Sequence, residues 1–184
     1  MRVTGESIPS QLRELLLSIR NASIARLTRY SWLAKEAAAR GGDLPANLVF
    51  SGTSGPLIIA LQSGPVIGVA SQPSLISVTL WLEREAGSDP DVHAVEADDP
   101  HFSRPEFAQM IGRRVTDISI LVRDAQNALW ESCPREVGVL LAIEDAPDLL
   151  LSHGLHDDSD DFSVLLREDV RSTLWPQLRE MRVE

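Results

Sequence analysis

The residues best suited to chemistry lie between 153 and 161, in the run His-Gly-Leu-His-Asp-Asp-Ser-Asp-Asp. Imidazole and carboxylate groups are common ligands of divalent cations. The run lacks the glycine and the ordered Asp or Asn positions of a calcium loop, and no cysteine pair accompanies the histidines to indicate zinc. We therefore predict no metal and no cofactor here. A metal-dependent enzyme that uses His153 and His156 stays open as the third hypothesis for function.

Candidate nucleophiles are few. Ser54 follows Gly-Thr and precedes glycine, but a nucleophile elbow needs its second glycine two residues beyond the serine, so we predict a turn. Cys133 precedes a proline and has no histidine near it in sequence, which favours a structural or incidental thiol. The chain has no glycine-rich phosphate loop and no dinucleotide fingerprint. We expect a protein that is not an enzyme.

Acidic charge is concentrated in a few segments. The chain has 27 acidic and 17 basic residues and a net charge of −10. Residues 144–161 contain seven acids and neither lysine nor arginine, whereas residues 1–40 contain seven basic and three acidic residues. Acidic surfaces repel nucleic acid and attract basic proteins. We therefore expect a protein partner and no nucleic acid.

The single cysteine and the absence of long apolar stretches bear on location. One cysteine excludes an internal disulfide and favours a reducing compartment. No apolar stretch approaches the roughly 20 residues that a membrane-spanning helix needs, and the first ten residues lack an apolar signal region. We expect a cytoplasmic protein that does not bind membranes.

The acidic run belongs to a segment with a clear β pattern. Three apolar runs, at 137–143, 149–151 and 162–166, are divided by acidic connections at 144–148 and 157–161. Short apolar runs divided by turn-forming residues are typical of antiparallel strands. The segment 135–168 is therefore predicted to be a β-meander whose connections carry most of its charge.

An earlier part of the chain shows a similar pattern. Strands are expected in four apolar runs separated by turn-forming residues, at 48–50, 57–61, 65–69 and 75–82. In the last run apolar residues alternate with Ser77, Thr79 and Trp81, which places Trp81 on the wetter face as a candidate interface residue.

Helices are expected around these strands. Apolar residues at 12, 15, 16 and 19 share one helical face, and residues 21–30 fit either a helix or a strand. A short helix is predicted at 105–112, followed by a strand at 115–122. A last helix is predicted at 168–182, interrupted near its Trp-Pro pair. The proline-rich acidic segment 86–103 is interpreted as a linker or long loop.

The two halves of the chain resemble each other. Residues 16–29 align with 110–123, residues 57–59 with 149–151, and residues 74–78 with 161–165. We therefore predict an α+β fold in one compact domain. It is built by internal duplication of a helix-strand-loop-meander unit, with antiparallel sheets and helices packed on one face. The first repeat spans 8–85 and the second 104–184. In that case residues 22–30 form a strand.

Charge distinguishes the two copies. The first-half connections are uncharged, so the fold itself does not require the acid at 153–161. This leads to the hypothesis of a non-catalytic, immunity-type inhibitor whose acidic loops neutralise a basic bacterial toxin. The alternative is a structural or self-associating domain, for example a homodimer formed through the edge of 75–82. The predicted partner-binding residues are His156, Asp157, Asp158, Asp160, Asp161 and Trp81.

Overall fold

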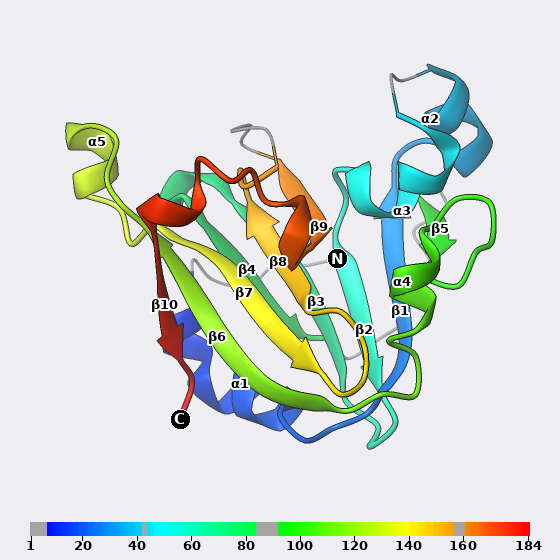
Figure 1. The fold of residues 1–184 in the computed structure, drawn as a ribbon, viewed down its shortest axis with the longest axis horizontal. Coiled ribbons are helices and arrows are strands. Elements are labelled where there is room, and N and C mark those ends of the chain that lie inside the picture. The colour runs from blue at the N-terminus through cyan, green and yellow to red at the C-terminus, as the bar shows by residue number, and fades with distance from the viewer. Residues whose placement is uncertain (1–6, 42–43, 84–91, 157–160) are drawn as a thin grey trace.

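The protein has an α+β fold with two antiparallel five-stranded sheets and several short helices (Figure 1). The computed structural model describes residues 7–41, 44–83, 92–156 and 161–184. The first sheet has the order β4-β3-β2-β1-β5 and the second the order β10-β6-β7-β8-β9.

The strands of the first sheet are β1 (Ile24–Ser31), β2 (Leu57–Leu61), β3 (Val66–Gln72), β4 (Ser77–Leu82) and β5 (His93–Glu96). Those of the second are β6 (Val115–Arg123), β7 (Glu136–Ile143), β8 (Leu149–His153), β9 (Phe162–Leu166) and β10 (Leu178–Arg182). The α-helices are α1 (Arg13–Ile19), α2 (Lys35–Gly41), α3 (Val49–Gly52), α4 (Pro105–Ala108) and α5 (Ala128–Glu131). The 3-10 turns are η1 (Pro9–Leu12), η2 (Ala46–Leu48), η3 (Pro73–Leu75), η4 (Arg167–Asp169) and η5 (Trp175–Gln177).

The two sheets share one topology. In each, four consecutive strands form a meander, and a fifth strand pairs with the free edge of the first. The predicted meander at 135–168 is confirmed as β7, β8 and β9, and the predicted strands at 57–61, 65–69, 75–82 and 115–122 are confirmed with small changes of boundary.

The register of the two sheets matches as well. Leu27 pairs with Ile59 in the first sheet, and Ile118 pairs with Leu141 in the second. In each case the ladder shifts register near the start of the first strand, between Ile24 and Arg26 and between Val115 and Asp117. The fifth strands also coincide, because Ala97 N donates to Leu27 O at 3.0 Å and Val183 N donates to Ile118 O at 2.9 Å. We call residues at the same register position equivalent.

Equivalent residues also meet where the two halves join. Ser23 forms an isolated antiparallel bridge with its equivalent, Arg114. Just before each of these positions the backbone has a positive φ, 66° at Asn21 and 81° at Gly112. The hydrogen bonds around the bridge come in equivalent pairs: Asn21 N to Val115 O (2.7 Å) with Gly112 N to Ile24 O (2.7 Å), and Ile24 N to Arg113 O (2.9 Å) with Val115 N to Ala22 O (2.9 Å). This is the pattern produced by a two-fold axis through the bridge.

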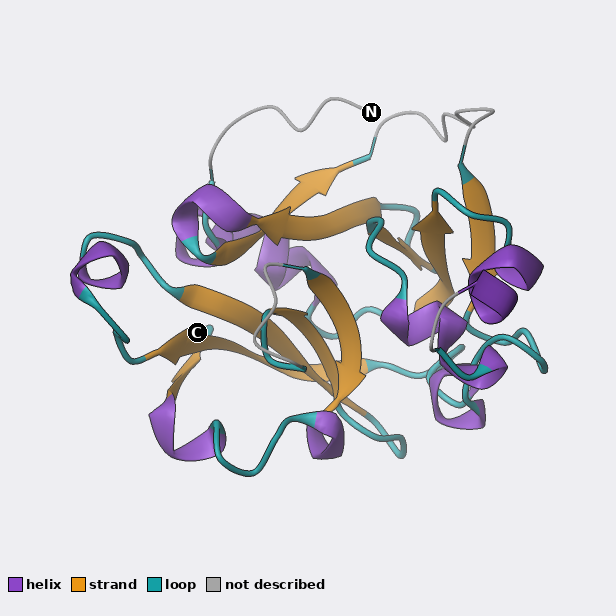
Figure 2. Ribbon diagram, turned by 90° about the horizontal axis from the view of Figure 1, so that it is seen from above, coloured by secondary structure: helices purple, strands orange, loops and turns teal. Residues whose placement is uncertain are grey.

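The two sheets enclose one apolar core. Strand β4 lies across β7 and β8, and Figure 2 shows the sheets as two layers. Buried residues of both sheets form one cluster, to which Phe50 and Phe107 add rings with centroids 5.0 Å apart. A second apolar cluster lies on the other face of the second sheet, where Val170 and Leu174 of the segment between β9 and β10 pack.

The predicted helix at 168–182 is wrong. Residues 167–169 and 175–177 form 3-10 turns, and residues 178–182 form β10, which pairs with β6. Pro176 prevents a continuous helix, and pairing with the free edge of β6 overrides the helical preference of Leu-Arg-Glu-Met-Arg. The helices are also not packed on one face of a sheet. They lie in separate connections around the sheets (Figure 1).

Three other expectations are corrected or decided by the structure. Residues 49–52 form helix α3 rather than the strand predicted at 48–50, because a three-residue apolar run does not distinguish the two. Residues 24–31 form a strand, which decides the alternative left open for 21–30. The predicted linker at 86–103 contains β5, whose polar sequence concealed its pairing with β1. Its first residues, 86–91, lie outside the described residues.

The alignment of the halves also changes. Strand β2 is equivalent to β7 rather than to residues 149–151, which are equivalent to part of β3. In the region of the first helix and first strand of each half, the structural alignment differs from the sequence alignment by three residues. Ile19, rather than Leu16, is equivalent to Met110, since Ala22 N donates to Ile19 O (3.0 Å) and Arg113 N donates to Met110 O (3.1 Å). Side-chain similarity alone had favoured the wrong register.

Candidate functional site

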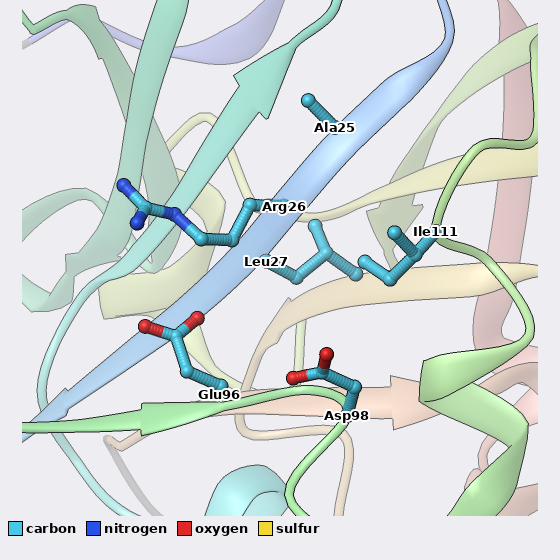
Figure 3. Close-up of a pocket in the computed structure, with 6 residues that line it drawn as sticks. All are labelled: Ala25, Arg26, Leu27, Glu96, Asp98 and Ile111. Carbon is cyan, nitrogen blue, oxygen red and sulfur yellow. The ribbon is translucent and has the colours of Figure 1, made fainter.

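A pocket of about 290 Å³ lies beside the β1 bulge, at the end of β5. Its lining comes from β1, from the end of β5 and from the turn after α4 (Figure 3), and consists of Ala25, Arg26, Leu27, Glu96, Asp98 and Ile111. The bulge places consecutive residues Ala25 and Arg26 on the exposed surface while Leu27 is fully buried. The pocket therefore combines an apolar base with a charged rim.

Two carboxylates and one guanidinium form that rim. Glu96 Oε2 accepts a hydrogen bond of 2.8 Å from Thr28 Oγ1, which fixes this carboxylate on the sheet. Asp98 is exposed, and within the described part of the chain its carboxylate forms no hydrogen bond or ion pair. Figure 3 shows the Arg26 guanidinium directed away from Asp98, with Leu27 between them. The rim carries a net charge of one negative unit.

A smaller pocket of about 90 Å³ lies between α3 and β9, and His156 is among the residues that line it. Its principal charged group, Arg104, forms an ion pair with Asp169 at 2.7 Å and another with Glu106 at 3.2 Å. Burial would lower the pKa of Arg104, but hydrogen bonds to Asp169 and Glu106 raise it above the ordinary value. The guanidinium is therefore engaged within the protein.

The two histidines of the predicted cluster face different regions. His153, at the end of β8, is buried, and its Nδ1 lies 2.6 Å from Ser71 Oγ on β3 of the other sheet. His156 is exposed beside the smaller pocket. Among the described residues, no group of three or more His, Cys, Asp or Glu side chains is placed to hold a metal ion. Asp157, Asp158 and Asp160 lie outside the described residues, and Asp161 is exposed directly before β9.

Arg29, which sequence reasoning missed, has a fully buried side chain between the halves. Its Nε donates to Thr53 Oγ1 at 3.2 Å, and its Nη2 donates to Thr53 O and, at 2.6 Å, to Phe162 O. The guanidinium lies 4.4 Å from the centre of the Phe162 ring. Nη1 has no hydrogen-bond partner among the residues that the structure describes. Burial lowers the pKa of Arg29 to about 9, against the opposing effect of Asp161, so it remains protonated at neutral pH.

This arrangement gives Arg29 a structural role. It connects the residue after α3 to the first residue of β9, and so joins the first half to the second. An arginine at a core position of a strand was the signal in the sequence, but it became readable only once 24–31 was known to be a strand.

Trp81, predicted as an interface residue, is engaged within the first sheet. Its Nε1 donates to Glu83 Oε2 at 2.8 Å, and its indole covers Gly68 on β3, where a Cβ atom would overlap the ring. Large side chains placed over a strand glycine fill the space that the glycine leaves. Trp81 is only half-buried, so part of the indole still faces solvent.

The most exposed tryptophan is Trp32, directly after β1, at 65% exposure, and its neighbour Leu33 is 56% exposed. Their backbone is held on both sides. Leu33 N donates to Ser31 Oγ at 3.1 Å, and Lys35 Nζ lies 2.6 Å from Asp99 Oδ2. The sequence pattern did not identify Trp32 as exposed, because it did not define where β1 ends.

The contacts of Asp99 help to fix the segment that carries Trp32 and Leu33, which we call the tip. Burial would raise the pKa of Asp99, but hydrogen bonds from Lys35 and from the amides of His101 and Phe102 together lower it below its usual value of 3.8. Lys35 also lies over the ring of Phe102, 5.1 Å from its centre. The residues that follow β5 thus hold the chain that presents Trp32 and Leu33.

Within the described residues, no helix has the length and apolar character needed to cross a membrane. Comparisons of the chain with protein-family models, with curated proteins and with solved structures give no match.

Proposed function

We propose that this protein is a non-catalytic module that binds a basic protein partner. The observation that carries the proposal is the exposed pair Trp32 and Leu33, two large apolar side chains held on an anchored tip. Tryptophan is enriched among residues that dominate binding energy, and a segment whose backbone is already anchored loses little conformational freedom on binding. The net charge of −10 favours a basic partner and speeds its association.

In its most concrete form, the proposal is an immunity-type inhibitor that covers a basic active-site cleft of a toxin. In this form Trp32 and Leu33 supply affinity, and the acidic connections, including Asp157, Asp158, Asp160 and Asp161, supply rate and specificity. A cytoplasmic location fits this role. Charge reversal of the four aspartates to lysine is expected to slow association, and unchanged association at low salt would remove the acidic connection from the account.

We further propose that the chain arose by duplication of one unit, represented by residues 8–85 and 104–184 in a single domain. The shared topology, the coincident register shifts and the bridge between Ser23 and Arg114 support this. A binding function suits such an origin, because changes in one copy leave the frame of the other intact.

The test is co-expression of the tagged protein with the product of the neighbouring gene. The wild type is expected to retain that product at a stoichiometric ratio, whereas the double variant Trp32→Ala, Leu33→Ala is expected to release it. Leu129→Ala is the matched control, because Leu129 is 71% exposed in the equivalent connection of the second half. Retention by the double variant, with its circular dichroism unchanged, would contradict the proposal.

Self-association is the second candidate, because the same exposed pair would suit a symmetric contact between two copies. Light scattering distinguishes the two. A wild-type dimer that becomes monomeric in the double variant would replace the partner hypothesis, and a wild-type monomer would exclude self-association.

A further inference from the structure

The 290 Å³ pocket is lined by Ile111, and at the equivalent position of the second half the protein carries an arginine, Arg20. Arg20 and Ile111 are equivalent, because each lies between one of the equivalent residues Ile19 and Met110 and one of the equivalent positive-φ residues Asn21 and Gly112. Arg20 Nη1 donates to Val183 O at 3.2 Å, at the end of the fifth strand β10. In the first half Ile111 lines the open pocket and has no donor to offer.

The residues around Arg20 have equivalents in the first half. Ala97 is equivalent to Val183, the residue whose carbonyl accepts from Arg20 in the second half. Asp98 is equivalent to Glu184 and lines the pocket with Glu96. The first half therefore has two carboxylates at the rim of the pocket and no arginine at the position equivalent to Arg20.

Neither Arg104 nor Arg26 replaces it. Arg104 stands where Arg13 stands in the other half, and its guanidinium is held by Asp169 at 2.7 Å. Arg26 is equivalent to Asp117, which in the second half pairs with Arg182 at 2.6 Å. Figure 3 shows the Arg26 guanidinium turned away from Asp98 and Ile111. A guanidinium placed at Asp98 would balance the single excess negative charge of the rim.

We propose that this pocket receives an arginine side chain of the protein partner, in the manner in which the second half receives Arg20. The planar guanidinium suits a carboxylate and a carbonyl oxygen together, which an ammonium group matches less well. Ile111, which is partly exposed, provides apolar surface for the methylene part of the arginine. The arginine's source in a partner rests on the proposed function, whereas the chemistry of the pocket does not.

The pocket and the exposed tip fit within one interface. Six residues of extended chain separate Arg26 from Trp32, which corresponds to roughly 20 Å. An interface of ordinary size covers such a span. The partner would contribute an apolar pocket for Trp32 and an arginine for the site at Asp98.

The experiment is a methyl-NMR titration of the full-length chain, labelled at leucine and isoleucine methyls. The probes are the peptide acetyl-Gly-Arg-Gly-amide and its citrulline analogue, which has nearly the same shape and no charge. The arginine peptide is expected to shift the Leu27 methyls saturably, with a Kd in the millimolar range that suits one side chain. The citrulline peptide is expected to leave them unchanged. Asp98→Asn is expected to weaken binding by about tenfold.

A reciprocal pair of variants makes the test stringent. Ile111→Arg is expected to fill the pocket from within and abolish the shift, whereas Ile111→Met, the control, keeps it. Arg20→Ile is expected to open the equivalent site and to add shifts at Ile118. Equal shifts with both peptides, no shift with either, or binding that survives Ile111→Arg would overturn the proposal. Peptide binding without partner capture would leave the pocket standing and remove the proposed function. If the partner is captured equally well by Ile111→Arg and the peptide does not bind, the proposed function stands and the arginine pocket is removed.

Discussion

Ser71 and His153 occupy equivalent positions on β3 and β8, and their side chains contact each other, with 2.6 Å between Oγ and Nδ1. Ser23 and Arg114 are a second equivalent pair that meets. The line that joins the two contacts follows the approximate two-fold axis of the chain. The internal symmetry is thus expressed in direct contacts between its related residues.

The Ser71 contact is expected to stabilise the packing of the two sheets. His153 is 3% exposed, so its ring nitrogen cannot exchange the serine for water without some rearrangement. Ser71→Ala is expected to lower the free energy of unfolding by about 1–3 kcal/mol, the range for a buried polar group that loses a partner. Urea denaturation measures it. Ser74→Ala, at an exposed serine, is the control and is expected to change little.

Arg29 is expected to be irreplaceable by lysine. The lysine ammonium is a single donor group, so it cannot donate to Thr53 and to Phe162 from separate nitrogens as the guanidinium does. It would also lie in the core, away from water. Arg29→Lys is expected to cost about 1.5–3 kcal/mol, the range for hydrogen bonds to a charged group. Arg26→Lys, on the exposed surface of the same strand, serves as the control. Equal urea midpoints for the two variants would contradict the structural role of Arg29.

The contribution of Asp99 is expected to depend on pH. Its pKa in the folded protein is lowered below 3.8, so its stabilising effect is complete well above that value and is lost as the pH falls through the folded-state pKa. Lys35 has a raised pKa, so the pair persists until strongly alkaline pH. Because Lys35 is 36% exposed, we expect only about 0.5–1 kcal/mol at neutral pH.

Thermal unfolding of Asp99→Asn across acid pH tests this dependence. The variant is expected to be less stable than the wild type at pH 7 and equal to it at the acid end. Asp98→Asn is the control, because Asp98 forms no hydrogen bond or ion pair with other described residues. A difference between wild type and Asp99→Asn that stays constant with pH would show that the carboxylate charge is not involved.

Gly68 is expected to tolerate no side chain. A Cβ atom there overlaps the Trp81 indole, which would have to move from the sheet. Gly68→Ala is expected to cost about 1–3 kcal/mol and to shift tryptophan fluorescence towards that of an exposed indole. Gly41→Ala, at a position with open space around it, is the control. An unchanged emission spectrum would place the Trp81 ring elsewhere.

The sequence predicted the strands of the meanders well and the edge strands β5 and β10 poorly. Apolar runs divided by turn residues identified β2 to β4 and β7 to β9, because these strands are defined by their own side chains. The strands β5 and β10 were missed, since their polar residues form strands only by pairing with the free edges of β1 and β6. Pairing across the chain is invisible in a local pattern.

The candidate sites followed the same division. The histidine run looked like one cluster, but His153 ends a strand with its side chain buried between the sheets, while His156 lies after it on the surface. The equivalence of Ile111 in the Asp98 pocket with Arg20 follows from the structural register of the two halves. The alignment made from the sequence was three residues away from that register. The exposure of Trp32 depends on where β1 ends.

The central claim is that the chain binds a basic protein through the anchored tip at Trp32. Titration calorimetry with the purified partner tests it, by comparing its affinity for the wild type, for Trp32→Ala and for Leu129→Ala. A loss of about 2 kcal/mol or more, equivalent to roughly a 30-fold rise in Kd, is predicted for Trp32→Ala, and a change within about twofold for Leu129→Ala. Equal affinities for wild type and Trp32→Ala would contradict the account.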